Sequence, residues 1–296
     1  MKYATGSAFR QALEERIRDI HAEQNIPIVR LRKQIAFERF IARLIRYQPE
    51  QWVLKGGLAL QLRLGEQART TKDIDLLNTA ISPSIYDSMA ESASMDLGDW
   101  FAFEVERPEG NVENKPGGKR YLVHRFLDGR LFENFHVDVG VGDIVLEAFE
   151  WLSFGSILGF AGIEPTSVPC YPIVQQIAEK LHALTRRHVS GGSSRSKDLA
   201  DILLLAKLGS INGDALKLAI VATFESRATH PLPAELSPLP KSLSREYEHL
   251  ADTLDLAYGT FDAAEQALGQ FLNPVLSDVF PGIWDAALWG WRISGS

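Results

Sequence analysis

Residues 52–78 constrain the fold more than any other part of the chain, because the hydrophobic pattern changes twice within them. The letters WVLKGGLALQLRLG indicate a short buried strand, a turn at Gly56-Gly57 and a short helix. The letters TKDIDLLN then alternate acidic and apolar residues, which is typical of a strand with one polar face. Side chains two positions apart on a strand point the same way, so we expect Asp73 and Asp75 to share a face.

The rest of the chain shows a mixed α/β pattern followed by a helical one. Helices are expected over two N-terminal stretches separated by Pro27, and then over residues 85–93, 173–187, 195–208, 215–227, 244–258 and 261–273. Strands are expected over residues 101–106, 119–126 and 132–141, and Asp128-Gly129 between the last two is a strong hairpin signal. Ser82-Pro83 is the expected start of the helix over 85–93. The predicted class is therefore α/β (α+β), with one domain at 1–168 and an α-helical domain at 169–296.

The composition excludes several classes of protein. With 45% hydrophobic and 23% charged residues, the chain is neither disordered nor fibrous. No apolar run approaches the roughly 20 residues that span a bilayer, and the first residues lack a secretory signal. Cys170 is the only cysteine, which excludes an intramolecular disulfide and a multi-thiolate zinc site. We expect a cytoplasmic protein with no membrane partner.

Charge is unevenly distributed along the chain. The net charge of −7 argues against a protein that coats nucleic acid through its overall charge. Up to Arg46, however, the chain contains ten Lys and Arg residues and only five acidic residues. The stretch from Lys180 to Lys197 contains cations and two histidines and no carboxylate. These clusters are either surfaces for a polyanion or solvated helix faces.

The paired aspartates carry the chemistry that the sequence indicates. Asp73 and Asp75 would project hard oxygen ligands to one side of a strand, as Mg²⁺ bound to a nucleoside triphosphate requires. Asp138 is the candidate third carboxylate, because it lies between Val137 and Val139, where an unpartnered charge would be costly. An Asp-x-Asp pair alone is weak evidence, since it also occurs on ordinary solvated strands and in metal-dependent glycosyltransferases.

The surroundings of the pair strengthen the assignment. Glycines at 56 and 57 let backbone amides approach a phosphate, and the helix that starts there adds its positive end. Lys55 precedes the glycines, and the run Arg69-Thr70-Thr71-Lys72 immediately precedes the aspartates. The candidate nucleotide-binding residues are Lys55, Gly56, Gly57, Arg69, Thr71, Lys72 and Asp198.

Four separated motifs, in this order, resemble a known family. They are Lys55-Gly56-Gly57-Leu58-Ala59-Leu60, Arg69-Thr70-Thr71-Lys72-Asp73-Ile74-Asp75-Leu76, Ala178-Glu179-Lys180-Leu181-His182-Ala183 and Lys197-Asp198-Leu199-Ala200-Asp201. The stretch from about residue 30 to 230 resembles the AbiEii family of nucleotidyltransferase toxins, in particular its MenT-type members, which belong to toxin-antitoxin systems.

The resemblance implies a DNA polymerase β-like nucleotidyltransferase domain joined to a helical domain. It implies Asp73 and Asp75 as catalytic metal ligands, Lys180 as a contact to the triphosphate, and Asp201 as an essential acid. Members of the family transfer nucleotides, often from CTP or UTP, to the 3′ end of tRNA, and an antitoxin protein restrains them. Many polymerase β-like enzymes have serine where Gly57 stands.

The sequence leaves three alternatives open. Asp198 and Asp201, three positions apart on a helix, could position Lys180 or an arginine, or could be part of a structural ion-pair network between helices. Thr70 or Thr71 could supply a hydroxyl to the phosphates or be phosphorylated by an antitoxin kinase. The alternatives to the tRNA acceptor are a protein or small-molecule acceptor, and a domain that binds nucleic acid or a partner without catalysis.

Overall fold

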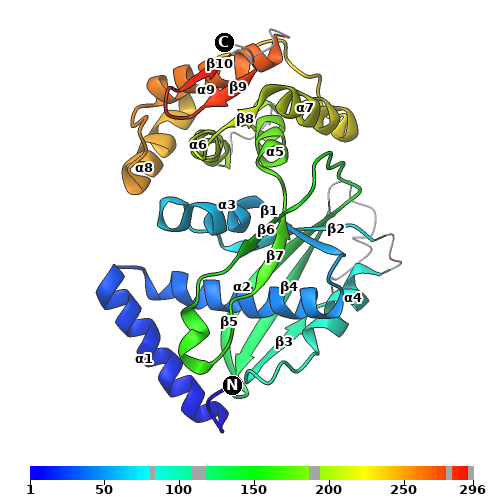
Figure 1. Cartoon of the computed structure of the whole chain (residues 1–296), viewed down its shortest axis with the longest axis vertical. Helices are drawn as coiled ribbons and strands as arrows, with labels where there is room; N and C mark the ends of the chain where they lie inside the picture. The colour runs from blue at the N-terminus through cyan, green and yellow to red at the C-terminus, as the bar shows by residue number, and fades with distance from the viewer. Residues whose placement is uncertain (81–83, 108–117, 187–193, 278–281, 293–296) are drawn as a thin grey trace. The chain divides into compact units, whose positions relative to one another are not determined.

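A computed structural model of the chain describes residues 1–80, 84–107, 118–186, 194–277 and 282–292. The chain forms two compact units (Figure 1). The α/β unit comprises residues 1–63, 70–142 and 149–170, and the helical unit comprises residues 64–69, 143–148 and 171–296. Within the described ranges, no helix is both long enough and apolar enough to cross a membrane.

The α/β unit is built on a seven-stranded mixed sheet. Its strands are β1 Trp52–Lys55, β2 Asp73–Asn78, β3 Phe101–Val105, β4 Lys119–Leu127, β5 Arg130–Val141, β6 Glu150–Ser153 and β7 Ser167–Cys170. Their spatial order is β3-β4-β5-β2-β1-β7-β6. The pairs β2–β5 and β1–β7 are parallel and the other pairs are antiparallel. The sequence pattern predicted β1 to β5 but missed β6 and β7.

Among the described residues, four α-helices accompany the sheet: α1 Gly6–Gln24, α2 Ile28–Tyr47, α3 Gly56–Leu64 and α4 Ile85–Ala93. Helix α2 crosses the strands in Figure 1, and its Phe37 and Phe40 rings lie 5.1 and 5.6 Å from that of Phe135 on β5. These aromatic contacts join α2 to the middle of the sheet. Helix α4 is capped by the hydroxyl of Ser84, whereas the expected cap Ser82 lies outside the described residues.

The hairpin between β4 and β5 has the expected turn and an unexpected bulge. Asp128 and Gly129 have φ values of 51° and 68°, the left-handed conformation that a two-residue hairpin turn needs. The register of the two strands then shifts between Arg125 and Phe126, because Phe132 on β5 has no partner on β4. A one-residue shift reverses which face each later side chain occupies relative to its partner strand.

The helical unit contains the five helices α5 Ile173–Thr185, α6 Ser194–Ala206, α7 Gly213–Arg227, α8 Ser244–Leu254 and α9 Phe261–Leu276 among its described residues. Helix α5 packs on α6 and α7, and α6 packs on α8 and α9. The tail adds β9 Ile283–Asp285 and β10 Gly290–Arg292, which pair with the short β8 Ile211–Asn212. This small sheet was not predicted. Trp284 is buried in it and donates its indole N–H to the carbonyl of Ala206 at 2.8 Å.

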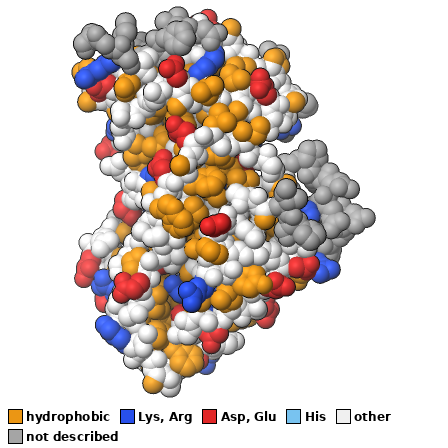
Figure 2. Space-filling model, turned by 45° about the vertical axis from the view of Figure 1, so that its right-hand side comes forward, with side chains coloured by type: hydrophobic (Ala, Val, Ile, Leu, Met, Phe, Trp, Pro, Cys, Tyr) orange, Lys and Arg blue, Asp and Glu red, His pale blue; other side chains and the backbone are white. Residues whose placement is uncertain are grey.

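Charges of both signs are interspersed on the face drawn in Figure 2, with hydrophobic side chains between them. The described residues of that face therefore show no extended surface of a single charge.

Candidate active site

Strand β2 has the two-sided pattern that its sequence predicts. Ile74 and Leu76 are fully buried, whereas Asp73 and Asp75 are half-buried on the opposite face. The apolar face packs in the hydrophobic core, and the acidic face can make polar contacts. The carboxylates of Asp73 and Asp75 are thereby presented on one side of a strand in the middle of the sheet.

Four neighbouring strands place one charged residue each in a single row across the sheet. Lys55 on β1, Asp75 on β2, Asp138 on β5 and Arg120 on β4 are successive Cα partners. Residues directly paired on adjacent strands point their side chains to the same face. Two carboxylates are therefore flanked by two cations, and Asp138 lies on the strand next to the aspartate pair, as expected.

Gly56 shapes the space beside Asp75. It has a φ of +64°, and a Cβ built on it would lie 2.1 Å from Oδ2 of Asp75. A side chain there is disfavoured twice, by the left-handed backbone and by the carboxylate. Helix α3 begins at this residue, directly after β1, so its first backbone amides lie next to an acidic side chain.

Arg120 links two of the carboxylates. Its Nε and Nη2 donate to Oδ1 and Oδ2 of Asp138, both at 2.8 Å. The same Nη2 donates to Oδ2 of Asp73, also at 2.8 Å. His136, the Cα partner of Asp73, places its Nδ1 3.6 Å from Oδ1 of that aspartate. Hydrogen bonding to Asp138, helped by the charges of both aspartates, raises the pKa of Arg120.

A divalent metal fits these donors. Carboxylate oxygens are the ligands that Mg²⁺ prefers, at about 2.1 Å. Nη2 of Arg120 is a cationic nitrogen 2.8 Å from an oxygen of both Asp73 and Asp138. A metal ion in its place would require each carboxylate to close in by less than about 1 Å. As the side chains stand, no three acidic, histidine or cysteine residues in the described ranges are gathered as a ready metal site, and Arg120 occupies the central position.

The segment before β2 is held in place by backbone and ionic contacts. Thr71 is buried and donates its hydroxyl to the carbonyl of Asp73 at 3.0 Å. Thr70 and Lys72 are exposed. Arg69 belongs to the helical unit, where its Nε and Nη2 donate to the Asp201 carboxylate at 3.0 to 3.2 Å.

The helical unit contains a buried charge cluster. Nζ of Lys180 on α5 lies 2.5 Å from Oδ2 of Asp201 and 3.7 Å from Oδ1 of Asp198, both on α6. Arg195 donates to Asp198 at 2.9 Å, and Arg69 completes the cluster through Asp201. The aspartates therefore do contact both Lys180 and arginines, and the cluster ties α5, α6 and the 64–69 segment together.

Burial and charge act in opposite directions within this cluster. Burial alone would lower the pKa of Lys180, but the charges of Asp201 and Asp198 outweigh it and raise the pKa. Burial would likewise raise the pKa of Asp201, but Lys180 and Arg69 hold it below its usual value. For Asp198, burial prevails over Lys180 and the pKa is raised. Lys180 and Asp201 are thus a charged pair, and Asp201 is fully buried.

The basic stretch between Lys180 and Lys197 is less cationic than its sequence suggests. Lys180 and Arg195 are paired with the aspartates of α6. His182 is buried, and burial, aided by Arg227, lowers its pKa to about 4, so it is neutral. Arg186 and Lys197 are exposed, while residues 187–193 of the stretch lie outside the described ranges.

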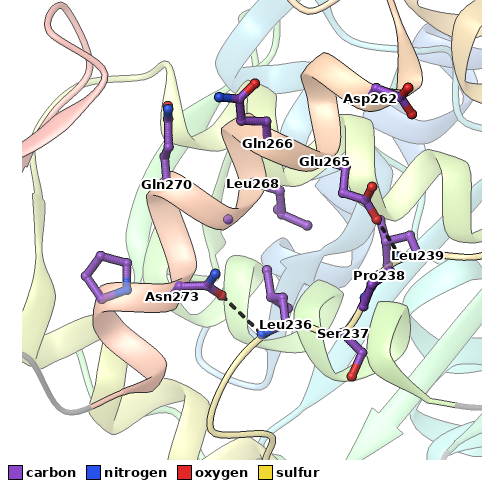
Figure 3. A pocket seen from close by; sticks show the side chains of 12 residues that line it. Leu236, Ser237, Pro238, Leu239, Asp262, Glu265, Gln266, Leu268, Gln270 and Asn273 are labelled. Carbon is purple, nitrogen blue, oxygen red and sulfur yellow. Dashed lines mark hydrogen bonds between the residues drawn. The ribbon is translucent and has the colours of Figure 1, made fainter.

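Two cavities in the helical unit do not include any predicted site residue. The first, of about 580 Å³, lies between residues 236–239 and α9 (Figure 3). There the amides of Leu236 and Leu239 donate to the side chains of Asn273 and Glu265. The second, of about 470 Å³, lies at the end of α7 and is lined in part by Phe224 and His230.

Sequence reasoning missed Arg120 and His136 as members of the site. Both occur in strands that it predicted, but only the pairing of β2 with β5 brings His136 to Asp73. The hairpin turn in the sequence indicates that the strand of Arg120 pairs with that of Asp138. If the register is extended from the Leu127–Arg130 pair without a bulge, however, Arg120 falls opposite Val137. The bulge places it opposite Asp138 instead.

Comparison with solved structures finds proteins of similar fold. The chain is similar to MenT4, a nucleotidyltransferase toxin from Mycobacterium tuberculosis H37Rv, with 17% identity and a TM-score of 0.50 over 83% of this chain and 91% of that one. Two Helicobacter pylori structures, JHP933 and a putative nucleotidyltransferase, match at 15% identity and TM-scores of 0.41, covering 80% and 83% of this chain and 96% and 97% of theirs. The match to MenT4 shows that the fold is that of nucleotidyltransferase toxins.

The sequence then gives the family. The family model described as nucleotidyl transferase AbiEii toxin, Type IV TA system, matches residues 39–278, and the chain belongs to this family. The protein is thus a toxin-type nucleotidyltransferase, which implies a nucleotide substrate and an antitoxin partner. A search among curated protein sequences finds no match.

Proposed function

We propose that this protein is a toxin that transfers a nucleoside monophosphate, from CTP or UTP, to the 3′ acceptor end of tRNA and thereby blocks translation. Its site of action is the cytoplasm, and a cognate antitoxin protein controls it. The observation that supports the proposal is the row in which Asp75 and Asp138 are Cα partners on parallel strands, with Asp73 on the same face. Carboxylates gathered in this way suit chemistry on a metal-bound triphosphate.

The proposed reaction forms one bond and breaks one. The 3′-hydroxyl oxygen of the RNA attacks the α-phosphorus of the nucleotide, and the bond from that phosphorus to the bridging oxygen of pyrophosphate breaks. A carboxylate of the site accepts the hydroxyl proton. Asp73, Asp75 and Asp138 would hold Mg²⁺, which supplies stabilisation of the negative charge that develops on the phosphoryl oxygens.

The nucleotide is proposed to bind through backbone and cationic groups. Gly56 and Gly57 at the start of α3 offer amides and the positive end of a helix to the phosphates. Lys55, one row position from Asp75, adds a positive charge on the same face. Lys180 is proposed as the cation for the triphosphate on the strength of the family resemblance, and its raised pKa keeps it protonated.

Arg69 and Asp201 are proposed to act by holding other groups. Asp201 is fully buried and accepts hydrogen bonds from both Arg69 and Lys180. A carboxylate in that position suits the task of fixing Lys180 and Arg69.

The RNA backbone is proposed to contact Arg186 and Lys197, because these are the exposed cations among the described residues of the basic stretch.

The test is an incubation of the protein with Mg²⁺, total tRNA and each of the four α-labelled NTPs in turn. Label is expected in tRNA with CTP or UTP. Periodate oxidation of the terminal 2′,3′-diol of the tRNA, which destroys the 3′-hydroxyl acceptor, is expected to abolish it. Asp73→Ala should eliminate the label. Asp87→Ala, which removes an exposed aspartate of α4, is the matched control and should label like the unaltered protein.

Each other outcome has a defined meaning. Label in a protein or a small molecule would show nucleotidyl transfer to another acceptor and overturn the tRNA assignment. Growth arrest that persists in cells expressing Asp73→Ala would indicate binding without turnover and overturn the enzymatic proposal.

A further inference from the structure

Arg120 is not used by the reaction proposed above, although it makes three hydrogen bonds to two of the carboxylates. We propose that Arg120 is a displaceable counter-ion: its guanidinium takes the metal position between Asp73 and Asp138 and leaves when a metal–nucleotide complex binds. The inference rests on the proposed function, since it concerns how metal enters that same site.

The geometry makes the guanidinium and a metal ion mutually exclusive. One nitrogen, Nη2, lies 2.8 Å from Oδ2 of Asp73 and 2.8 Å from Oδ2 of Asp138. A divalent ion that bound both oxygens at about 2.1 Å in the same place would overlap with this nitrogen. Two cations cannot share it, both because of overlap and because of repulsion. Metal binding by these two carboxylates therefore requires Arg120 to move.

The exposure of Arg120 indicates that it can move at low cost. Its side chain is 53% exposed and that of Asp138 is 37% exposed. A half-exposed ion pair is screened by water and contributes little to stability. The ion pair between Arg43 and Asp99 in the same unit is different, because its side chains are only 0% and 2% exposed. Arg43 is fixed in the core, whereas Arg120 can turn into solvent.

The balance of charge indicates what drives the exchange. Asp73, Asp75 and Asp138 are offset on this face by Arg120 and Lys55. A free divalent ion would have to expel a bound cation and leave it without a partner. A metal–nucleotide complex carries net negative charge and gives the released guanidinium a phosphate to bind, because arginine forms strong paired hydrogen bonds with phosphate. Metal and nucleotide binding are therefore expected to favour each other.

The first experiment measures Mn²⁺ binding to the full chain without nucleotide, by calorimetry or by the electron paramagnetic resonance signal of free Mn²⁺. Arg120→Ala should bind Mn²⁺ about tenfold more tightly than the unaltered protein, because the competing charged hydrogen bonds are gone. Arg120→Lys, which keeps the charge but loses the paired geometry, should lie between them. Arg130→Ala, an exposed arginine at the start of β5, is the control and should not change binding.

The second experiment repeats the titration with a non-hydrolysable CTP analogue at a fixed concentration, with Mn²⁺ binding by the analogue itself subtracted. The analogue should strengthen Mn²⁺ binding to the unaltered protein more than to Arg120→Ala. Adding Asp138→Asn to Arg120→Ala should remove the gain in Mn²⁺ affinity, which assigns it to this site.

Unchanged or weaker Mn²⁺ binding in Arg120→Ala, with its circular dichroism spectrum unaltered, would overturn the inference. So would an equal effect of the analogue on both proteins. These readouts do not depend on catalysis, so a protein that labels no acceptor would defeat the proposed function without deciding the role of Arg120.

Discussion

Gly56 and Asp75 are in such close contact that a methyl group on the glycine would lie 2.1 Å from Oδ2 of the aspartate. The turn that starts α3 and the strand that carries the carboxylate are therefore fitted to each other. Backbone conformation contributes as well, because Gly56 has a φ of +64°. The presence of glycine at this position follows from both the local turn and the neighbouring strand.

Gly56→Ala is expected to abolish nucleotidyl transfer, because the new methyl group displaces the Asp75 carboxylate. It should also lower the free energy of unfolding by about 1–3 kcal/mol through backbone strain. Gly65→Ala is the matched control: Gly65 has a φ of +58° but nothing within 4 Å of an added Cβ. It should lose stability but keep activity. Chemical denaturation and the tRNA labelling assay measure the two effects, and equal activity in both variants would contradict the argument.

Asp138→Asn is expected to lower the rate of transfer at least about a hundredfold, because a neutral amide is a poor ligand for a divalent metal. Stability should change little, since Asp138 is half-exposed and its ion pair with Arg120 is screened. The measurements are the labelling rate and the melting temperature. Transfer at the normal rate by a folded variant would remove Asp138 from the proposed metal ligands.

Asp201→Asn is expected to destabilise the helical unit by about 3 kcal/mol, because it removes the carboxylate that pairs with the buried Lys180 and with Arg69. Lys180→Met should lower the free energy of unfolding by less, because Asp201 keeps Arg69 as a partner. Both variants should lose transfer activity. Urea unfolding followed by circular dichroism compares their stabilities, and the prediction is wrong if Asp201→Asn is as stable as the unaltered protein.

Glu38 predicts a dependence of stability on pH. It is 1% exposed on α2, and burial, despite the amide that Thr166 donates to it, raises its pKa from 4.5 to about 7. Between pH 4.5 and 7 the folded protein binds this proton more tightly than the unfolded chain does. Glu38 therefore costs stability as the pH rises through that window, and the full cost, on the order of 3 kcal/mol, is present above pH 7.

Glu38→Gln should accordingly stabilise the protein relative to its parent at pH 8 and much less at pH 5. The amide oxygen of glutamine can still accept the hydrogen bond from Thr166. Taking the difference between the two proteins at each pH removes the contributions of other titrating groups. A difference in unfolding free energy that is the same at pH 5 and pH 8 would show that Glu38 does not titrate in this range.

The sequence by itself determined the local features of the site. The alternation around Asp73 and Asp75 predicted a strand with one acidic face, and the buried Ile74 and Leu76 confirm it. The Asp128-Gly129 signal predicted the hairpin between β4 and β5. Such features follow from side-chain periodicity and backbone preference, which act over a few neighbouring residues. The four family motifs likewise sufficed to name the AbiEii family that the family model confirms.

Only the tertiary structure decided which charged groups meet. The parallel pairing of β2 with β5 places Asp138 beside Asp75, and the bulge at Phe132 turns Arg120 toward Asp138. Burial against α6 makes Lys180 one member of an ion-pair cluster instead of a free cation. Strand partners, register shifts and burial depend on contacts between residues far apart in the chain, and the local periodicity of the sequence does not encode them.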